Sequence, residues 1–129
     1  MITPETTILY AGILGLMAIG LGAAAGIRRG KSGISIGDGG DQELLLRMRR
    51  HANFVENVPL ALILLALLEM QGISATAIHV LGAVLVLGRI MHMVGFNDNV
   101  GNPVRGIGAG LTILVIAITS VWGIVSYVT

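Results

Sequence analysis

The sequence predicts an all-α integral membrane protein built as a four-helix up-down bundle. Hydrophobic residues occupy 54% of the 129 positions, charged residues only 12%, and the mean hydropathy is +0.87. Soluble domains carry about twice this charged fraction, and a soluble core of 13.4 kDa could not bury so much apolar surface. The composition therefore excludes a disordered chain, a basic nucleic-acid module and most soluble enzymes. A single domain, residues 1–129, is the expected organisation.

The first of four expected membrane spans covers about residues 8–27. Its twenty residues carry no charge. About twenty residues is the length that a helix needs to cross the hydrocarbon core. The preceding segment, 1–7, contains Glu5 and no Lys or Arg, whereas a signal peptide opens with a basic region. We therefore expect this first apolar segment to be retained as a membrane helix.

The other three spans are expected at about 53–71, 73–91 and 104–128. A connection rich in Gly, Ser and Asp, residues 30–41, disfavours regular structure. A helix then begins near Gln42, with a charged first part and an apolar second part. A short turn at 69–72 and a polar stretch at 95–103 separate the remaining spans.

The basic residues cluster around the first and third connections, and the N-terminus, the second connection and the C-terminus have none. In a four-span chain these two connections share one side of the membrane. The positive-inside rule places that side in the cytoplasm and both termini outside. The eight residues are Arg28, Arg29, Lys31, Arg47, Arg49, Arg50, Arg89 and Arg105.

A polar face on the second helix is the leading candidate site. Arg49, Asn53 and Glu56 stand at i, i+4 and i+7 and so share one face. Pro59 follows, and its missing N–H leaves the Val55 carbonyl without an intrahelical partner. A carboxylate at membrane depth costs about 2.5–3.5 kcal/mol unless it is paired, which favours a functional role. The alternative is an Arg–Glu pair that only ties helices together.

The third and fourth spans carry further polar groups on the same side. Arg89 and His92 are at i and i+3, and Arg105 begins the fourth span. Arginines with polar partners suit a small anionic ligand with carboxylates, and the alternative is an ordinary positive-inside cluster. His51 and His79 are weaker candidates.

Two further patterns are less specific. There is no cysteine and no His/Glu pair with metal-ligand spacing, so no metal site is predicted. Gly22/Gly26 and Gly106/Gly110 have the small-xxx-small spacing of close helix contacts, which equally fits the general abundance of glycine in membrane helices.

The segment RRHANFVENVP, from Arg49 to Pro59, resembles the R-x-x-x-N-x-x-E-x-x-P motif of the MAPEG family. This family comprises membrane-associated proteins in eicosanoid and glutathione metabolism, including microsomal glutathione transferases and leukotriene C4 synthase. The resemblance extends over nearly the whole chain, through the four spans and the basic connections. The stretch RRHANFVENVPLALILLALLE is especially similar to bacterial members.

The resemblance implies a homotrimer in a bacterial inner membrane that binds glutathione as a co-substrate between subunits near the cytoplasmic face. From the residue spacing and the composition, we expect no metal and no nucleic-acid partner. Arg105 would stabilise the glutathione thiolate as the catalytic residue. The residues expected to bind glutathione are Arg28, Arg49, Asn53, Glu56, Asn57 and His92, with Arg89, His51 and Pro59 in support.

The chain departs from the eukaryotic synthases of the family at the positions of their tyrosines. It has Asn57, His92 and Phe96 there, and the Phe96 side chain cannot form a hydrogen bond. The third connection is also about two residues longer before Arg105, which weakens the alignment of that arginine.

The function implied by the resemblance is a glutathione-dependent transferase or peroxidase that acts on lipophilic electrophiles. One alternative is a small multidrug-type transporter, a class that usually places its glutamate in the first span, which here has no acid. The other is a non-catalytic membrane scaffold in which the polar face only sets trimer packing. The sequence does not specify the electrophile.

Overall fold

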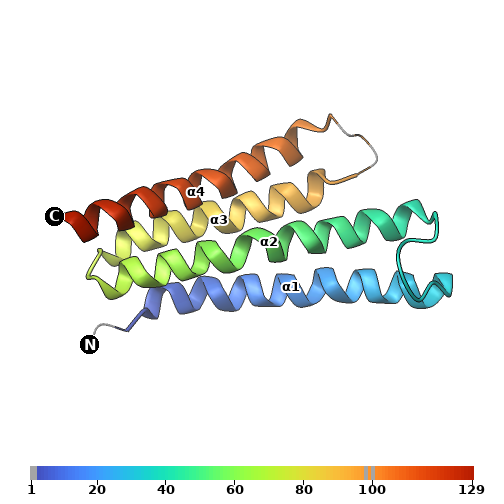
Figure 1. Cartoon of the computed structure of the whole chain (residues 1–129), viewed down its shortest axis with the longest axis horizontal. Helices are drawn as coiled ribbons and strands as arrows, with labels where there is room; N and C mark the ends of the chain where they lie inside the picture. The colour runs from blue at the N-terminus through green and yellow to red at the C-terminus, as the bar shows by residue number, and fades with distance from the viewer. Residues whose placement is uncertain (1–2, 98, 100) are drawn as a thin grey trace.

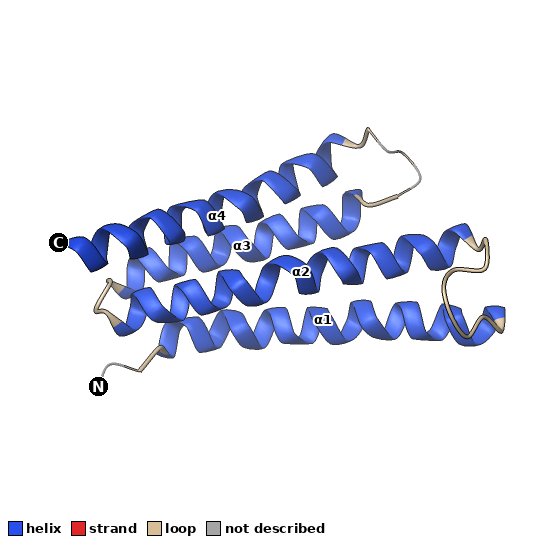
Figure 2. Ribbon diagram, in the orientation of Figure 1, coloured by secondary structure: helices blue, strands red, loops and turns tan. Residues whose placement is uncertain are grey.

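Four helices make up the computed structural model, which describes residues 3–97, 99 and 101–129. They are α1 (Glu5–Ser32), α2 (Gln42–Met70), α3 (Ala75–Gly95) and α4 (Pro103–Val128). The helices alternate in direction (Figures 1 and 2), and no strand occurs among the described residues. The α1–α2 and α3–α4 connections lie at one end, and both termini lie at the other (Figure 1). The predicted all-α, up-down bundle is confirmed.

Each helix is long and apolar enough to cross a membrane. The helices extend beyond the expected spans, most clearly in α2, which runs for 29 residues. At 1.5 Å per residue α2 is about 43 Å long, whereas the hydrocarbon core is about 30 Å thick. The charged first turns of α2 can therefore project from the apolar layer without breaking the helix.

Many large apolar side chains lie on the outside of the bundle. Leu16, Ile19 and Ile124 expose 73%, 69% and 66% of their surface. Such a continuous apolar exterior needs lipid rather than water as its solvent. The buried core that the helices share consists of Leu14, Leu21, Phe54, Val58, Ala61, Leu65, Leu68, Ile78, Leu81, Leu85 and Val115.

The turn expected at 69–72 begins two residues later than predicted, because α2 continues to Met70 and residues 71 and 72 form the turn. Glu69 lies inside the helix, 6% exposed. Its carboxylate accepts hydrogen bonds from the Thr6 N–H at 2.7 Å, the Thr7 N–H at 2.8 Å and the Thr7 hydroxyl at 2.7 Å. The first N–H groups of a helix have no partner within it, and Glu69 supplies one from another helix. The carboxylate thereby fastens the start of α1 to the end of α2.

The glycines at which two helix backbones come closest are not those that the small-xxx-small spacing predicts. A Cβ on Gly108 of α4 would lie 2.5 Å from the Gly88 carbonyl oxygen of α3. Of the four expected glycines, only Gly22 faces another helix, with His51 Nε2 at 3.3 Å from its Cβ position. The other three (Gly26, Gly106 and Gly110) have nothing within 4 Å in the described chain. The expected pairs therefore do not set the packing within this chain.

Candidate ligand site at the basic end of the bundle

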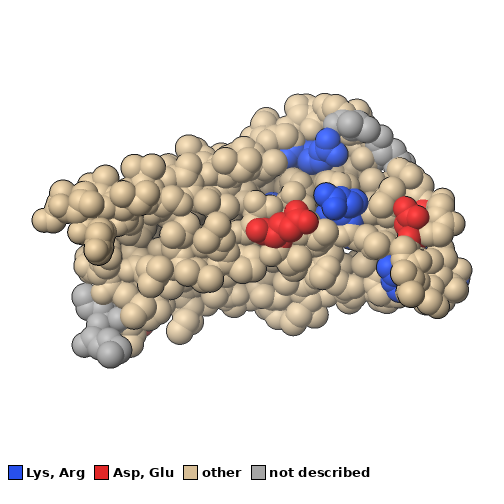
Figure 3. Space-filling view, in the orientation of Figure 1, with Lys and Arg blue, Asp and Glu red and all other residues tan. Residues whose placement is uncertain are grey.

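Charged side chains gather at the end that holds the α1–α2 and α3–α4 connections. In Figure 3, both the basic and the acidic residues of the visible face lie over that half, and the half toward the termini shows neither. The gathering of basic residues that the sequence predicts is therefore present in three dimensions.

The predicted polar face of α2 is open along its length. Arg49 and Glu56 are exposed, and Asn53 between them is half-buried. Neither Arg49 nor Glu56 takes part in an ion pair or side-chain hydrogen bond within residues 3–97, 99 and 101–129. Seven residues of helix place them about 10 Å apart along the axis, too far for a direct pair. The interpretation as an Arg–Glu pair is therefore not supported within one chain.

Asn53 is held from behind by a buried arginine. Arg89 of α3 is 2% exposed, and its Nη1 donates to Asn53 Oδ1 at 2.9 Å. Its Nη2 lies 3.3 Å from His92 Nδ1, and its guanidinium stacks over the Phe54 ring, 5.3 Å from the centroid. Arg89 Nε has no hydrogen-bond partner in the described structure. Three site candidates of the sequence, Asn53, Arg89 and His92, thus form one network.

A small cavity of about 40 Å³ opens beside this network, between α2, α3 and α4. Asn57 lines it, and its Nδ2 donates to the Asn53 backbone carbonyl at 2.8 Å. A water molecule needs about 10–15 Å³ of such volume, so the cavity admits only a small group. The full lining is Asn53, Asn57, Arg89, Ala109, Thr112 and Ile113.

Arg105 lies at the junction of α3 and α4, where the two backbones nearly touch. A Cβ on Gly95 would lie 2.9 Å from Arg105 Cα, so only glycine fits there. The Arg105 guanidinium is 5.1 Å from the centroid of the Phe96 ring. The His92 ring packs on the same phenylalanine, with its centroid 5.3 Å from that of the Phe96 ring. Catalytic candidate Arg105 and candidate His92 therefore share one aromatic neighbour.

Arg50 is a residue of this end that sequence reasoning did not place in the site. Its Nε donates to the Phe96 backbone carbonyl at 2.7 Å, and its Nη2 donates to the same oxygen. Phe96, which stands where the synthases have a tyrosine, differs from it only in the side chain. Its backbone carbonyl accepts these bonds from Arg50 and so links α2 to the start of the third connection. No sequence pattern predicts such a contact.

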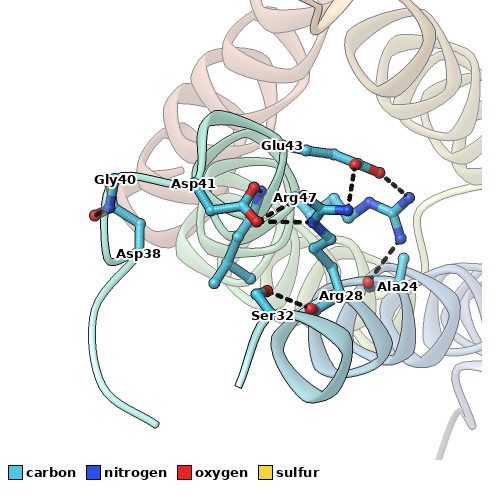
Figure 4. Close-up of polar contacts among 9 residues, drawn as sticks. Ala24, Arg28, Ser32, Asp38, Gly40, Asp41, Glu43 and Arg47 are labelled. Carbon is cyan, nitrogen blue, oxygen red and sulfur yellow. Dashed lines mark hydrogen bonds and ion pairs between the residues drawn. The ribbon is translucent and has the colours of Figure 1, made fainter. Parts of the chain in front are cut away.

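Arg28 is engaged away from Asn53, in the first connection. Its Nη2 lies 2.7 Å from Asp41 Oδ2, and its Nη1 lies 2.9 Å from Glu43 Oε2 (Figure 4). Arg47 joins the same cluster through Glu43 and the Ala24 carbonyl. The hydrogen bond from Arg28 holds the pKa of the Asp41 carboxyl below its usual value. Within one chain, this expected glutathione ligand orders the connection instead.

The remaining candidates flank the site or lie away from it. His51 is half-buried against Gly22, and Pro59 lies within α2, beside an apolar groove of about 210 Å³ between α1 and α2. His79 is at the opposite end, where the Tyr10 hydroxyl lies 2.9 Å from its Nδ1 and donates to its carbonyl. In the part of the chain that the structure describes, no three His, Cys, Asp or Glu side chains are grouped to hold a metal ion.

Comparison with known proteins bears on this geometry. The model of the MAPEG family matches residues 7–125, nearly the whole chain. This chain belongs to the MAPEG family. The match includes α2, α3, nearly all of α1 and α4, and every candidate site residue. The membrane bundle and its polar face therefore lie within a family domain of glutathione and eicosanoid metabolism.

Curated relatives of the chain are similar over a shorter stretch. The inner membrane protein YecN of Escherichia coli strain K12 is 42% identical over 64 residues, which are 50% of this chain and 49% of the relative. YecN of Escherichia coli O6:H1 matches to the same extent. The chain thus aligns with about half the length of these relatives.

Proposed function

We propose that this chain is a membrane-bound, glutathione-dependent transferase or peroxidase that acts on lipophilic electrophiles. The observation that carries the proposal is the α2 face, where Arg49 and Glu56 are exposed on either side of a fixed Asn53. Glutathione has one ammonium, two carboxylates and a thiol. Glu56 would bind the ammonium, and Arg49 would bind a carboxylate through a charge-assisted pair.

Arg105 would stabilise the thiolate of glutathione. A cation within about 4–6 Å lowers a thiol pKa by about 1–3 units because it favours the charged form. The thiolate sulfur would then attack an electrophilic carbon and expel its leaving group as an anion. In the peroxidase reaction it would attack a hydroperoxide oxygen and release the alcohol, leaving glutathione sulfenic acid. The thiol of a second glutathione would then attack the sulfenic sulfur, forming the disulfide and releasing water.

An apolar groove supports a lipophilic second substrate. The groove between α1 and α2 has a volume of about 210 Å³ and is lined on α2 by Phe54, Val55, Val58, Pro59 and Leu62. These residues alternate along α2 with those of the polar face, so the groove lies at the same depth in the bundle as the proposed glutathione site.

We further propose that the active form is a homotrimer in a bacterial inner membrane, with the first and third connections in the cytoplasm. The exposure of Arg49 and Glu56 fits a site that a neighbouring subunit completes. The basic residues at one end fit the positive-inside orientation. The relatives named inner membrane proteins support the membrane assignment.

Calorimetry with glutathione on the detergent-solubilised protein tests the proposal. We expect binding at millimolar ligand and conjugation of an activated aryl halide. Arg105→Ala is expected to lower the rate at neutral pH about tenfold or more, by raising the thiol pKa at least one unit, while the affinity changes less. Lys31→Ala, which removes an exposed cation at the same end, is the matched control. The absence of glutathione binding by the wild-type oligomer would refute the proposal.

A further inference from the structure

Arginine can donate hydrogen bonds but cannot accept them, and this fixes the orientation of the Asn53 amide. Arg89 Nη1 lies 2.9 Å from Asn53 Oδ1. If the amide were reversed, its NH₂ group would face the guanidinium donor and the contact would be repulsive. The two N–H groups of Asn53 must therefore point away from Arg89.

The same reasoning fixes the tautomer of His92. Arg89 Nη2 lies 3.3 Å from His92 Nδ1, so Nδ1 is an acceptor and carries no proton. In a neutral imidazole the proton is then on Nε2. Arg89 thus determines the hydrogen-bonding character of two side chains on two different helices.

Asn57 is less restricted than Asn53. One N–H of its Nδ2 donates to the Asn53 backbone carbonyl at 2.8 Å, which leaves its other N–H and its Oδ1 for further contacts. Both asparagines line the 40 Å³ cavity with Arg89. Asn53 is therefore the asparagine of the cavity whose polarity Arg89 fixes, whereas Asn57 keeps both a donor and an acceptor.

The burial of Arg89 gives this arrangement its rigidity. The side chain is 2% exposed and stacks on Phe54, and no ion pair with Arg89 occurs among the described residues. A buried cation without a counter-charge is destabilising, and an apolar residue of similar size would serve the fold better. A role in stability alone does not account for an arginine here.

We propose that Arg89 is a positioning residue that sets the hydrogen-bond polarity of the ligand site. It holds Asn53 as a donor and His92 as the Nε2–H tautomer. The ligand group that meets Asn53 is therefore an acceptor, a carboxylate or an amide carbonyl. The identity of that ligand as glutathione rests on the proposed function, whereas the polarity does not.

Asn53→Asp is the variant that tests the polarity. The aspartate keeps an acceptor for Arg89 and adds the missing counter-charge, so thermal stability in detergent is expected to equal or exceed that of the wild type. It has no N–H to donate and repels a carboxylate, so glutathione affinity is expected to fall about tenfold or more, the equivalent of one lost interaction of 1.4 kcal/mol. Unchanged or tighter binding would show that Asn53 accepts from the ligand and would overturn the proposal.

Nitrogen-15 spectra of the histidine rings give a second readout that needs no ligand. We expect the His92 signal, assigned by its loss in His92→Gln, to report the Nε2–H tautomer in the wild type. In Arg89→Met, a matched apolar replacement, the Nδ1–H tautomer should become populated. An Nδ1–H tautomer in the wild type would refute the role of Arg89. If glutathione fails to bind the wild type, these spectra still decide the part of the proposal that concerns His92.

Discussion

Replacing Glu69 with glutamine removes the charge from the contact that joins α2 to the start of α1. The wild-type carboxylate accepts three hydrogen bonds of 2.7–2.8 Å from Thr6 and Thr7. Glutamine keeps one carbonyl oxygen, and its NH₂ group must then face N–H groups that also donate. At least one backbone N–H of α1 is left without a partner in a buried position.

The magnitude follows from these contacts. Hydrogen bonds to a charged group contribute about 1.5–3 kcal/mol each, and a buried unsatisfied donor costs about 1–3 kcal/mol. A glutamine oxygen at the Oε2 position keeps both Thr7 bonds and loses the Thr6 bond. One lost bond and one unsatisfied N–H together cost about 2.5–6 kcal/mol, which the relief of burying a charge partly offsets. We expect a net loss of about 3 kcal/mol, corresponding to a fall in Tm on the order of 10 °C.

Thermal unfolding in a mild detergent, followed by circular dichroism, measures the effect. Glu5→Gln is the control, because Glu5 is an exposed acid at the same end, and its removal should change Tm by only a few degrees. Thr7→Val, which removes only the hydroxyl bond, should fall between the two. A Tm for Glu69→Gln within 2 °C of the wild type would refute the reasoning that this carboxylate holds α1 in place.

Two further predictions concern the α3–α4 contact and the first connection. Gly108→Ala should lower the Tm strongly, because its Cβ would lie 2.5 Å from a backbone oxygen, whereas Gly110→Ala, with open space around it, should not; equal effects in the thermal scan would contradict this. The pKa of Asp41 is lowered in the folded state, so its carboxylate stabilises the fold above the unfolded value of about 3.9, and this is lost as the pH falls through the lower folded value. Hydrogen exchange at the α2 start should accelerate in that acidic range, and Asp41→Asn should show no such step while Asp38→Asn keeps it.

The sequence predicts the membrane bundle because its signals are local or compositional. Apolar runs of about twenty residues, the placement of the basic residues and the Arg49–Asn53–Glu56 spacing each depend on one segment at a time. The helical face of α2 follows from a period of 3.6 residues, and the structure places those three side chains as that period requires. The role of Glu56 in binding glutathione stays a prediction from the family resemblance.

The partners of the polar side chains could not be predicted in this way. Glu69 and Thr7 are 62 residues apart, and Arg89 and Asn53 are 36 residues apart. No periodicity in one segment indicates which residue of another segment lies opposite it. For the same reason the sequence analysis placed Glu69 in a turn and named Gly106 and Gly110 but not Gly108, the glycine that packs against α3.

The amino-acid sequence alone thus determined that this protein lies in a lipid bilayer and has four helices. It also determined the end of the bundle at which the cations gather, because hydrophobicity and charge act on each helix independently. Tertiary structure decided which charges are free to meet a ligand. Packing commits Arg28 to Asp41 and Glu43 and buries Arg89 behind Asn53, while Arg49 remains exposed. That division depends on which helices touch, and only the folded chain brings those surfaces together.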